Sequence, residues 1–187
     1  MVMPTLRHDW TVEERDALPD DGKRYEVIDG ELFVTPTPAL RHQAAVGELF
    51  RIIADYIDRE RVGYVFGSPI DVVFSRRRAL EPDLSVLPLV NGRRPETFQA
   101  AGKALLVVEV LSPSTARVDR IHKRRVFREE AVPEYWIVDL DARAIERTTP
   151  AESRPEILDE RLEWFPEGAS APLVVDLPAY FGKVLDE

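Results

Sequence analysis

The chain has 187 residues, which is enough for one well-buried core and too few for two ordinary domains. It contains no cysteine, so disulfides and thiolate-bound zinc are excluded. The formal net charge of -9 argues against a protein that coats nucleic acid nonspecifically, although the middle of the chain is locally basic. We find neither an apolar signal core nor a spanning segment, and we predict a cytoplasmic protein with no membrane partner.

The first third of the chain predicts an exposed arm, a β-hairpin and a long helix. Residues 1–22 are polar and acidic and are expected to form an N-terminal arm, with a short helix near 11–14. Two alternating runs flank Asp29 and Gly30, and this pair of residues is the strongest short signal for a hairpin. Prolines then open a helix of roughly 38–60, whose apolar positions predict one core-facing stripe.

The later strands are predicted from short apolar or alternating runs bounded by glycine and proline. They lie at 64–66, 70–74, 84–87, 104–111, 135–140 and 143–149. The run 104–111 is almost wholly apolar, which is typical of a strand buried on both faces. The runs 135–140 and 143–149 are expected to pair, and 88–103 predicts a loop with one helical turn.

A second long helix is predicted from hydroxyl caps and an early proline at 112–115, and it should end near residue 130. The apolar residues expected to face inward on this helix are Val118, Ile121, Val126 and Phe127. The C-terminal part predicts weak strands and a docked turn or helix at 177–181. We therefore predict one mixed α/β domain over 1–187.

Glu109 is the most informative residue, because it lies near the end of the apolar run 104–111. An ionised carboxylate there would cost several kcal/mol, roughly, unless a cation or strong hydrogen bonds compensate it. The chain offers two candidate partners: Lys123, or a metal ion shared with Asp83, which follows Pro82. This order of residues is the outline of a metal-dependent site that cleaves phosphodiesters.

Such a site would use Mg²⁺ to neutralise charge and to lower the pKa of a bound water. Asp83 and Glu109 could supply carboxylate ligands if their strands are neighbours, and the carbonyl of Val110 could supply a third. In the simplest version of the motif the lysine lies two residues after the glutamate, but that position is Leu111. A long lysine stem at position 123 could reach the same point from the following helix.

Each of these residues also has an ordinary structural explanation. Asp83 could be only a strand-entry aspartate, and Glu109 could form a structural ion pair with Lys123. Lys123 lies four residues after Asp119, which allows a surface pair on a helix. Two further candidates, Glu26 and His42, could be a solvent-facing strand residue and a packing histidine. The functional interpretation therefore depends on the combination and its order.

Several segments together carry a resemblance to a known family. They are RYEVIDGE (24–31), RHQ (41–43), EPDL (81–84), VEVLSPST (108–115), DR with Lys123 (119–120 and 123) and PEYWIVD (133–139). The chain from about residue 24 to 180 resembles the Uma-two-type putative restriction endonuclease family of bacteria. Two departures, Ala131 in place of the usual glycine and Phe127 in place of a frequent tyrosine, do not touch the proposed metal site.

This resemblance implies a restriction-endonuclease-like core of the PD-(D/E)XK type, a central mixed sheet flanked by helices. It implies that Asp83 and Glu109 are metal ligands and that Lys123 is the displaced catalytic lysine. It also implies that Glu26 makes a second metal or water contact, whereas the role of His42 is open. A shared fold by itself licenses no chemistry.

We therefore predict an endodeoxyribonuclease that uses Mg²⁺ (or Mn²⁺), acts on DNA and forms a homodimer. The candidates for contact with nucleic acid are Arg117, Arg120, Arg124 and His42. An alternative is an inactive binding or assembly module in which Glu109 and Lys123 only neutralise each other. Hydrolysis of a glycoside by paired carboxylates is a third possibility, but we identify no pattern for sugar stacking.

Overall fold

The computed structural model describes residues 9–35 and 38–186. Its centre is a six-stranded mixed sheet. In spatial order the strands are β10 (Glu156–Leu158), β9 (Ala144–Thr148), β8 (Tyr135–Asp139), β7 (Leu106–Val110), β6 (Leu84–Pro88) and β3 (Gly63–Gly67). Only β7 and β8 pair in parallel, and the chain crosses between them through a helix, as a parallel connection requires.

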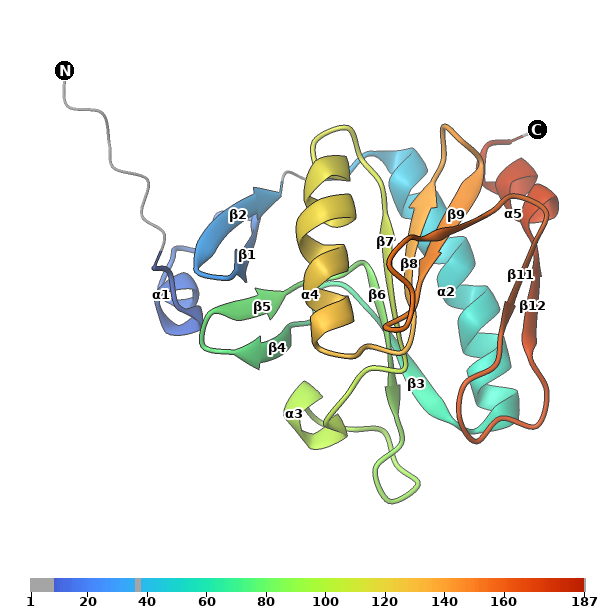
Figure 1. The fold of residues 1–187 in the computed structure, drawn as a ribbon, viewed down its shortest axis with the longest axis horizontal. Coiled ribbons are helices and arrows are strands. Elements are labelled where there is room, and N and C mark those ends of the chain that lie inside the picture. The colour runs from blue at the N-terminus through green and yellow to red at the C-terminus, as the bar shows by residue number, and fades with distance from the viewer. Residues whose placement is uncertain (1–8, 36–37, 187) are drawn as a thin grey trace.

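Helices cover both faces of this sheet (Figure 1). The helix α4 (Arg124–Glu129) lies on one face, and α2 (Leu40–Glu60) lies on the other with α5 (Leu177–Val184) beside it. The ribbon of β11 (Arg161–Trp164) and β12 (Leu173–Asp176) extends the α2 side. The predicted helix at 38–60, the pairing of 135–140 with 143–149 and the docked C-terminal helix are thereby confirmed.

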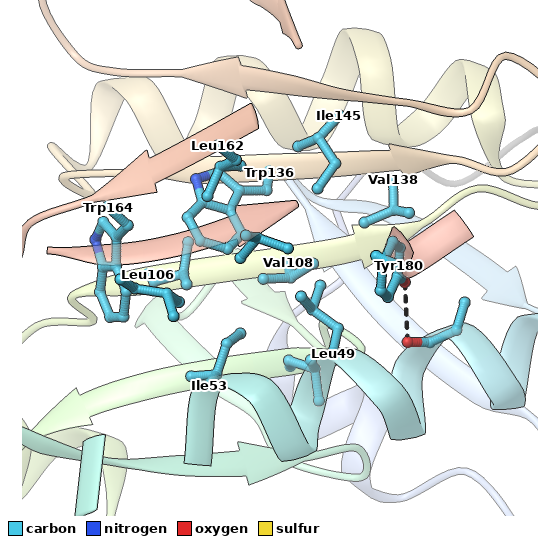
Figure 2. Close-up of a cluster of buried hydrophobic side chains, with 14 of the residues drawn as sticks. Leu49, Ile53, Leu106, Val108, Trp136, Val138, Ile145, Leu162, Trp164 and Tyr180 are labelled. Carbon is cyan, nitrogen blue, oxygen red and sulfur yellow. Dashed lines mark hydrogen bonds between the residues drawn. The ribbon is translucent and has the colours of Figure 1, made fainter. Parts of the chain in front are cut away.

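The α2 side of the sheet holds the larger part of the core. Figure 2 shows Trp136 and Val108 of the sheet facing Leu49 of α2, with Trp164 of β11 beside them. The rings of Trp136 and Trp164 meet edge to face, with centroids 5.8 Å apart. The hydroxyl of Tyr180 in α5 donates to a carbonyl of α2 at 3.0 Å (dashed in Figure 2), which ties the C-terminal helix to the core.

The two faces of β7 explain where its glutamate points. All residues of β7 are buried, as predicted for the run 104–111. Leu106 and Val108 belong to the core under α2, whereas Val107 packs in the second core under α4. Because side chains alternate along a strand, Glu109 faces the same side as Val107, toward the helix that carries Lys123.

A smaller antiparallel sheet lies beside α4, in the order β2 (Glu31–Thr35), β1 (Arg24–Ile28), β5 (Arg78–Leu80) and β4 (Val72–Ser75). The predicted hairpin is confirmed, with Asp29 and Gly30 both at positive φ in its turn. β5 was not predicted, because its sequence begins in a run of three arginines rather than an apolar run. This strand joins the hairpin to β4.

The start of the described chain packs against this smaller sheet. The short helix α1 (Val12–Asp16) has a capping box, and Arg15 within it is buried and pairs with Asp71 at 2.7 Å. This part of the predicted N-terminal arm is therefore not freely exposed, while residues 1–8 lie outside the described residues. The predicted helical turn in the loop 88–103 is α3 (Phe98–Ala101).

The helix predicted from 112 to 130 contains a π-helical segment, η1 (Val118–Lys123), which continues into α4. Asp119 and Lys123, four residues apart, point inward, while Ile121 is 55% exposed. The prediction that Ile121 faces inward is wrong, because Ile121 is two residues from both Asp119 and Lys123 and therefore lies on the opposite side of the helix. Across the described ranges, no helix is long and apolar enough to span a membrane.

Candidate functional site

The central sheet brings Asp83 and Glu109 together. β6 and β7 pair antiparallel with Leu84 opposite Val108, so one further step along this register places Asp83 opposite Glu109. Opposite residues of an antiparallel pair have their side chains on the same face and within a few ångströms. Both carboxylates are buried, Asp83 at 3% and Glu109 at 4% exposure.

Asp83 is held as an anion by three donors. Arg24 donates to its Oδ1 through both terminal nitrogens, at 3.1 and 3.2 Å. Its Oδ2 accepts from the main-chain N–H of Val110 at 2.9 Å and lies 3.1 Å from Nε2 of His42. Burial alone would raise the pKa of Asp83, but His42, Val110 and Arg24 outweigh it and lower this pKa.

Lys123 is buried among three carboxylates, and its side chain is only 4% exposed. Its Nζ lies 2.8 Å from Glu109, 2.9 Å from Glu26 and 3.4 Å from Asp119. The pair formed with Asp119 is thus a buried contact within the π-helical turn and not a surface pair. Glu26 is 2% exposed, so it is not a solvent-facing strand residue either.

The charges of this cluster do not balance, since one ammonium faces three carboxylates. Burial would lower the pKa of Lys123, but Glu109, Glu26 and Asp119 raise it well above its ordinary value. Burial raises the pKa of Glu109 well above its ordinary value. Lys123 lowers this pKa, but the negative charges of Asp119 and Asp83 raise it further, so the net shift is upward. The cluster therefore favours a charged lysine and a proton on one carboxylate.

Glu26 connects the smaller sheet to the site. Its Oε1 accepts from the main-chain N–H of Glu81 at 2.8 Å as well as from Lys123. Arg24 lies two residues earlier on β1, on the same face of the strand, and reaches Asp83. One strand of the hairpin therefore holds both halves of the site, the aspartate through Arg24 and the lysine through Glu26.

These side chains open onto a cavity of about 190 Å³. Its walls include Asp83, Glu109 and Lys123, and the loop 112–115 also lines it. In the described part of the chain, no group of three or more His, Asp and Glu side chains is arranged to hold a metal ion. The donor set is two carboxylates, which suits a hard cation that keeps part of its water shell.

Two residues of the site were not identified as functional from the sequence. Arg24 could have been found, because it precedes Glu26 by two positions in a predicted strand and must share its face. For Asp119 the sequence indicates only a surface pair with Lys123, since helical spacing alone does not reveal burial. Both residues position other side chains and are themselves bonded within the protein.

The three candidate arginines have different surroundings. Arg117 is exposed. Arg120 pairs with Asp139 and Glu146, each at 2.6 Å, and Arg124 also pairs with Glu146. The guanidinium groups of Arg120 and Arg124 therefore already neutralise buried or half-buried carboxylates. Contact of all three with nucleic acid stays a prediction.

The fold is an α/β fold with a mixed central sheet between helices, as the resemblance implied. It is similar to the crystal structure of "a putative nuclease belonging to DUF820" from Anabaena variabilis, with a TM-score of 0.76. The two chains are 22% identical over 93% of this chain and 98% of the other. At this identity the likeness establishes the fold.

Residues 12–177 match the Uma2 family, described as "Putative restriction endonuclease". The match covers most of the chain, so the protein belongs to this family, as the resemblance of its segments predicted. No curated protein matches the chain. Membership of the family supports a nuclease function.

Proposed function

We propose that the protein is a Mg²⁺-dependent endonuclease that hydrolyses phosphodiester bonds of DNA. The observation that carries the proposal is the meeting of Asp83 and Glu109 at one cavity, with Lys123 bonded to Glu109 at 2.8 Å. Burying several carboxylates is costly, and such groups with strongly shifted pKa values are typical of functional sites. The protein would act in the cytoplasm as a homodimer, as predicted from the sequence.

Asp83 and Glu109 would hold the ion, with the carbonyl of Val110 as a further ligand. Bound there, Mg²⁺ (or Mn²⁺) would neutralise phosphate charge and lower the pKa of a water molecule. Two carboxylates match this ion because Mg²⁺ commonly keeps several waters and takes its remaining ligands from substrate phosphate.

The protein groups have distinct tasks in this mechanism. Lys123 would donate a hydrogen bond to the attacking water or to the charged phosphate oxygen, which stabilises the charge that develops there. Glu26 keeps the Lys123 ammonium at the cavity through its contact of 2.9 Å. Arg24 and His42 hold the Asp83 side chain in place and keep it ionised. Arg117, which is exposed, is the simplest candidate for a contact with phosphate.

An inactive binding module is the second candidate function. The contact between Lys123 and Glu109 favours it, because the ammonium and the carboxylate already neutralise and hydrogen-bond each other. Each oxygen of Asp83 likewise has a donor within the protein. If these contacts are purely structural, then a divalent cation should find no free carboxylate at the cavity.

Calorimetric titration of Mg²⁺ and Mn²⁺ separates the two functions. Native protein should bind the ion, and both Asp83→Asn and Glu109→Gln should abolish binding and DNA cleavage. Glu134→Gln is the control, since this half-buried glutamate bonds Trp136 and lies outside the cavity. Cleavage retained in Glu109→Gln and in Lys123→Ala would refute the mechanism. If the native protein neither binds the ion nor cleaves DNA, the binding module becomes the better explanation.

A further inference from the structure

A second, larger groove lies directly beside the candidate site. Its volume is about 510 Å³, and it runs between the first half of α2 and the turn 67–69. Asp83 and Arg24 line both this groove and the smaller cavity, so the two spaces share a wall. The base of a nucleotide whose phosphate lies at the cavity would therefore lie next to the groove.

The floor of the groove is apolar and open. Val46 and Phe50 of α2 and Leu84 of β6 form it, and each is attached to the core under α2. Gly47 lies on the exposed side of α2, and a Cβ placed there would meet nothing within 4 Å. A Cβ at Gly67, across the groove, would meet only ordinary contacts at 3.9 Å. The missing side chains at both glycines leave room for a flat apolar group.

The charges at the groove disfavour a phosphate there. The two cations that line it, among the described residues, are already paired: Lys23 with Asp21 at 2.6 Å and Arg24 with Asp83 at 3.1 Å. Glu81 and Asp20 add two further carboxylates to the wall. A neutral group with an apolar face is therefore preferred to an anion.

The polar rim offers hydrogen bonds of both kinds. The amide of Gln43 donates and accepts, and the hydroxyl of Ser68 already donates to Glu81 at 3.0 Å. A carboxylate such as Glu81 accepts hydrogen bonds from amino groups. An apolar floor with mixed polar groups at the edge is the environment that an unstacked nucleobase requires.

We propose that this groove binds a nucleobase that is unpaired and turned out of the DNA strand next to the scissile phosphate. The proposal rests on the proposed nuclease function, because it assumes that the phosphate lies at the cavity of Asp83 and Glu109. The substrate class is then DNA with an unpaired or displaced nucleotide, and fully paired duplex is a weaker ligand.

Fluorescence anisotropy in EDTA at low salt tests this without any cleavage. The probes are a duplex with one unpaired nucleotide, the same duplex with an abasic residue at that position, and a fully paired duplex. Native protein should bind the first probe about tenfold more tightly than the abasic one, the order of magnitude for one base held on an apolar or aromatic surface. Gly47→Leu fills the groove and should bring the two affinities within about twofold of each other.

Ala44→Leu is the matched control, because Ala44 is exposed on the same helix and does not line the groove. It should retain the preference of the native protein. Gly47→Leu is expected to fold, since the added side chain enters open space and leucine favours a helix over glycine. Equal binding of the first two probes by native protein, or an unchanged preference in Gly47→Leu, would overturn the proposal. Absence of binding to every probe would overturn it as well.

Anisotropy and cleavage together distinguish failure of the groove proposal from failure of the nuclease function. If native protein prefers the unpaired base but does not cleave any probe with Mg²⁺, the groove binds as proposed and the catalytic assignment is wrong. If it cleaves all three probes equally and shows no preference in anisotropy, the catalytic assignment stands and the groove proposal fails.

Discussion

Replacing Lys123 by methionine removes the single cation from the cluster of Glu109, Glu26 and Asp119. Methionine keeps most of the buried volume, so the change is mainly electrostatic. The cluster then has to take up about one further proton to regain its charge balance. For a carboxyl of ordinary pKa, this protonation costs about 3.7 kcal/mol at pH 7 and about 1 kcal/mol at pH 5. The first value lies within the range of about 3–5 kcal/mol expected for breaking a buried ion pair.

The sign of the pH dependence follows from proton binding. Apart from the proton that Lys123 itself carries, the folded variant binds about one proton more than the folded native protein, while the unfolded chains bind alike near neutral pH. The loss of stability should therefore grow with pH, by about 1.4 kcal/mol per pH unit between pH 5 and 8. The pKa of Glu109 is already raised in the native protein, so its own contribution to stability is greatest below its ordinary pKa and falls as pH rises.

Urea unfolding at pH 5, 6, 7 and 8 measures this dependence, and at pH 7 the melting temperature should fall by about 10 °C. Lys183→Met is the control, because Lys183 makes a 2.7 Å pair with Glu48 but is 54% exposed. Such a surface pair contributes about 0–1 kcal/mol, with little change in this pH range. If Lys123→Met costs no more than Lys183→Met at pH 8, or costs the same at pH 5 and pH 8, the account of the cluster is wrong.

Three further predictions test the packing and the electrostatics. Ile121→Ser should change stability by less than about 0.5 kcal/mol in urea unfolding, whereas Phe127→Ala should cost about 3–5 kcal/mol; equal losses would contradict the outward orientation of Ile121. Tyr180→Phe should cost about 0.5–1.5 kcal/mol by calorimetry, because a carbonyl inside α2 loses one of its donors, and no loss would contradict the importance of this bond. Arg24→Gln should cost about 3 kcal/mol at pH 7, where the lowered pKa of Asp83 contributes its full stabilisation. This stabilisation is lost as pH falls from the ordinary carboxyl pKa through the lowered one, so the cost should shrink in acid; a loss at pH 3 as large as that at pH 7 would contradict this.

The strands and helices with a strong period were predictable from the sequence. The run 104–111 has no polar residue except Glu109, and it forms the central strand β7. Asp29 and Gly30 specify a hairpin because both accept positive φ in its turn. β5 was not predictable in this way, since its three residues gain their position from pairing with β1 and β4.

The main residues of the candidate site were predictable from the sequence, but the contacts between them were not. The order of Asp83, Glu109 and Lys123 indicated a metal site, and the register of β6 and β7 places the two carboxylates opposite each other. The contact of Lys123 with Glu26 spans 97 positions of the chain, and no local pattern encodes it. Arg24 likewise meets Asp83 only because the hairpin packs beside the central sheet.

The sequence by itself determined the chemistry available to this protein: which strand is buried, which carboxylate lies within it, and which lysine could compensate it. Local periodicity and the cost of burying charge were sufficient for that, because both act between neighbouring residues or on one residue at a time. The tertiary structure alone decided that Lys123 faces three carboxylates and that Ile121 turns outward. Those outcomes depend on contacts between elements far apart in the chain, whose energies appear only after the elements pack.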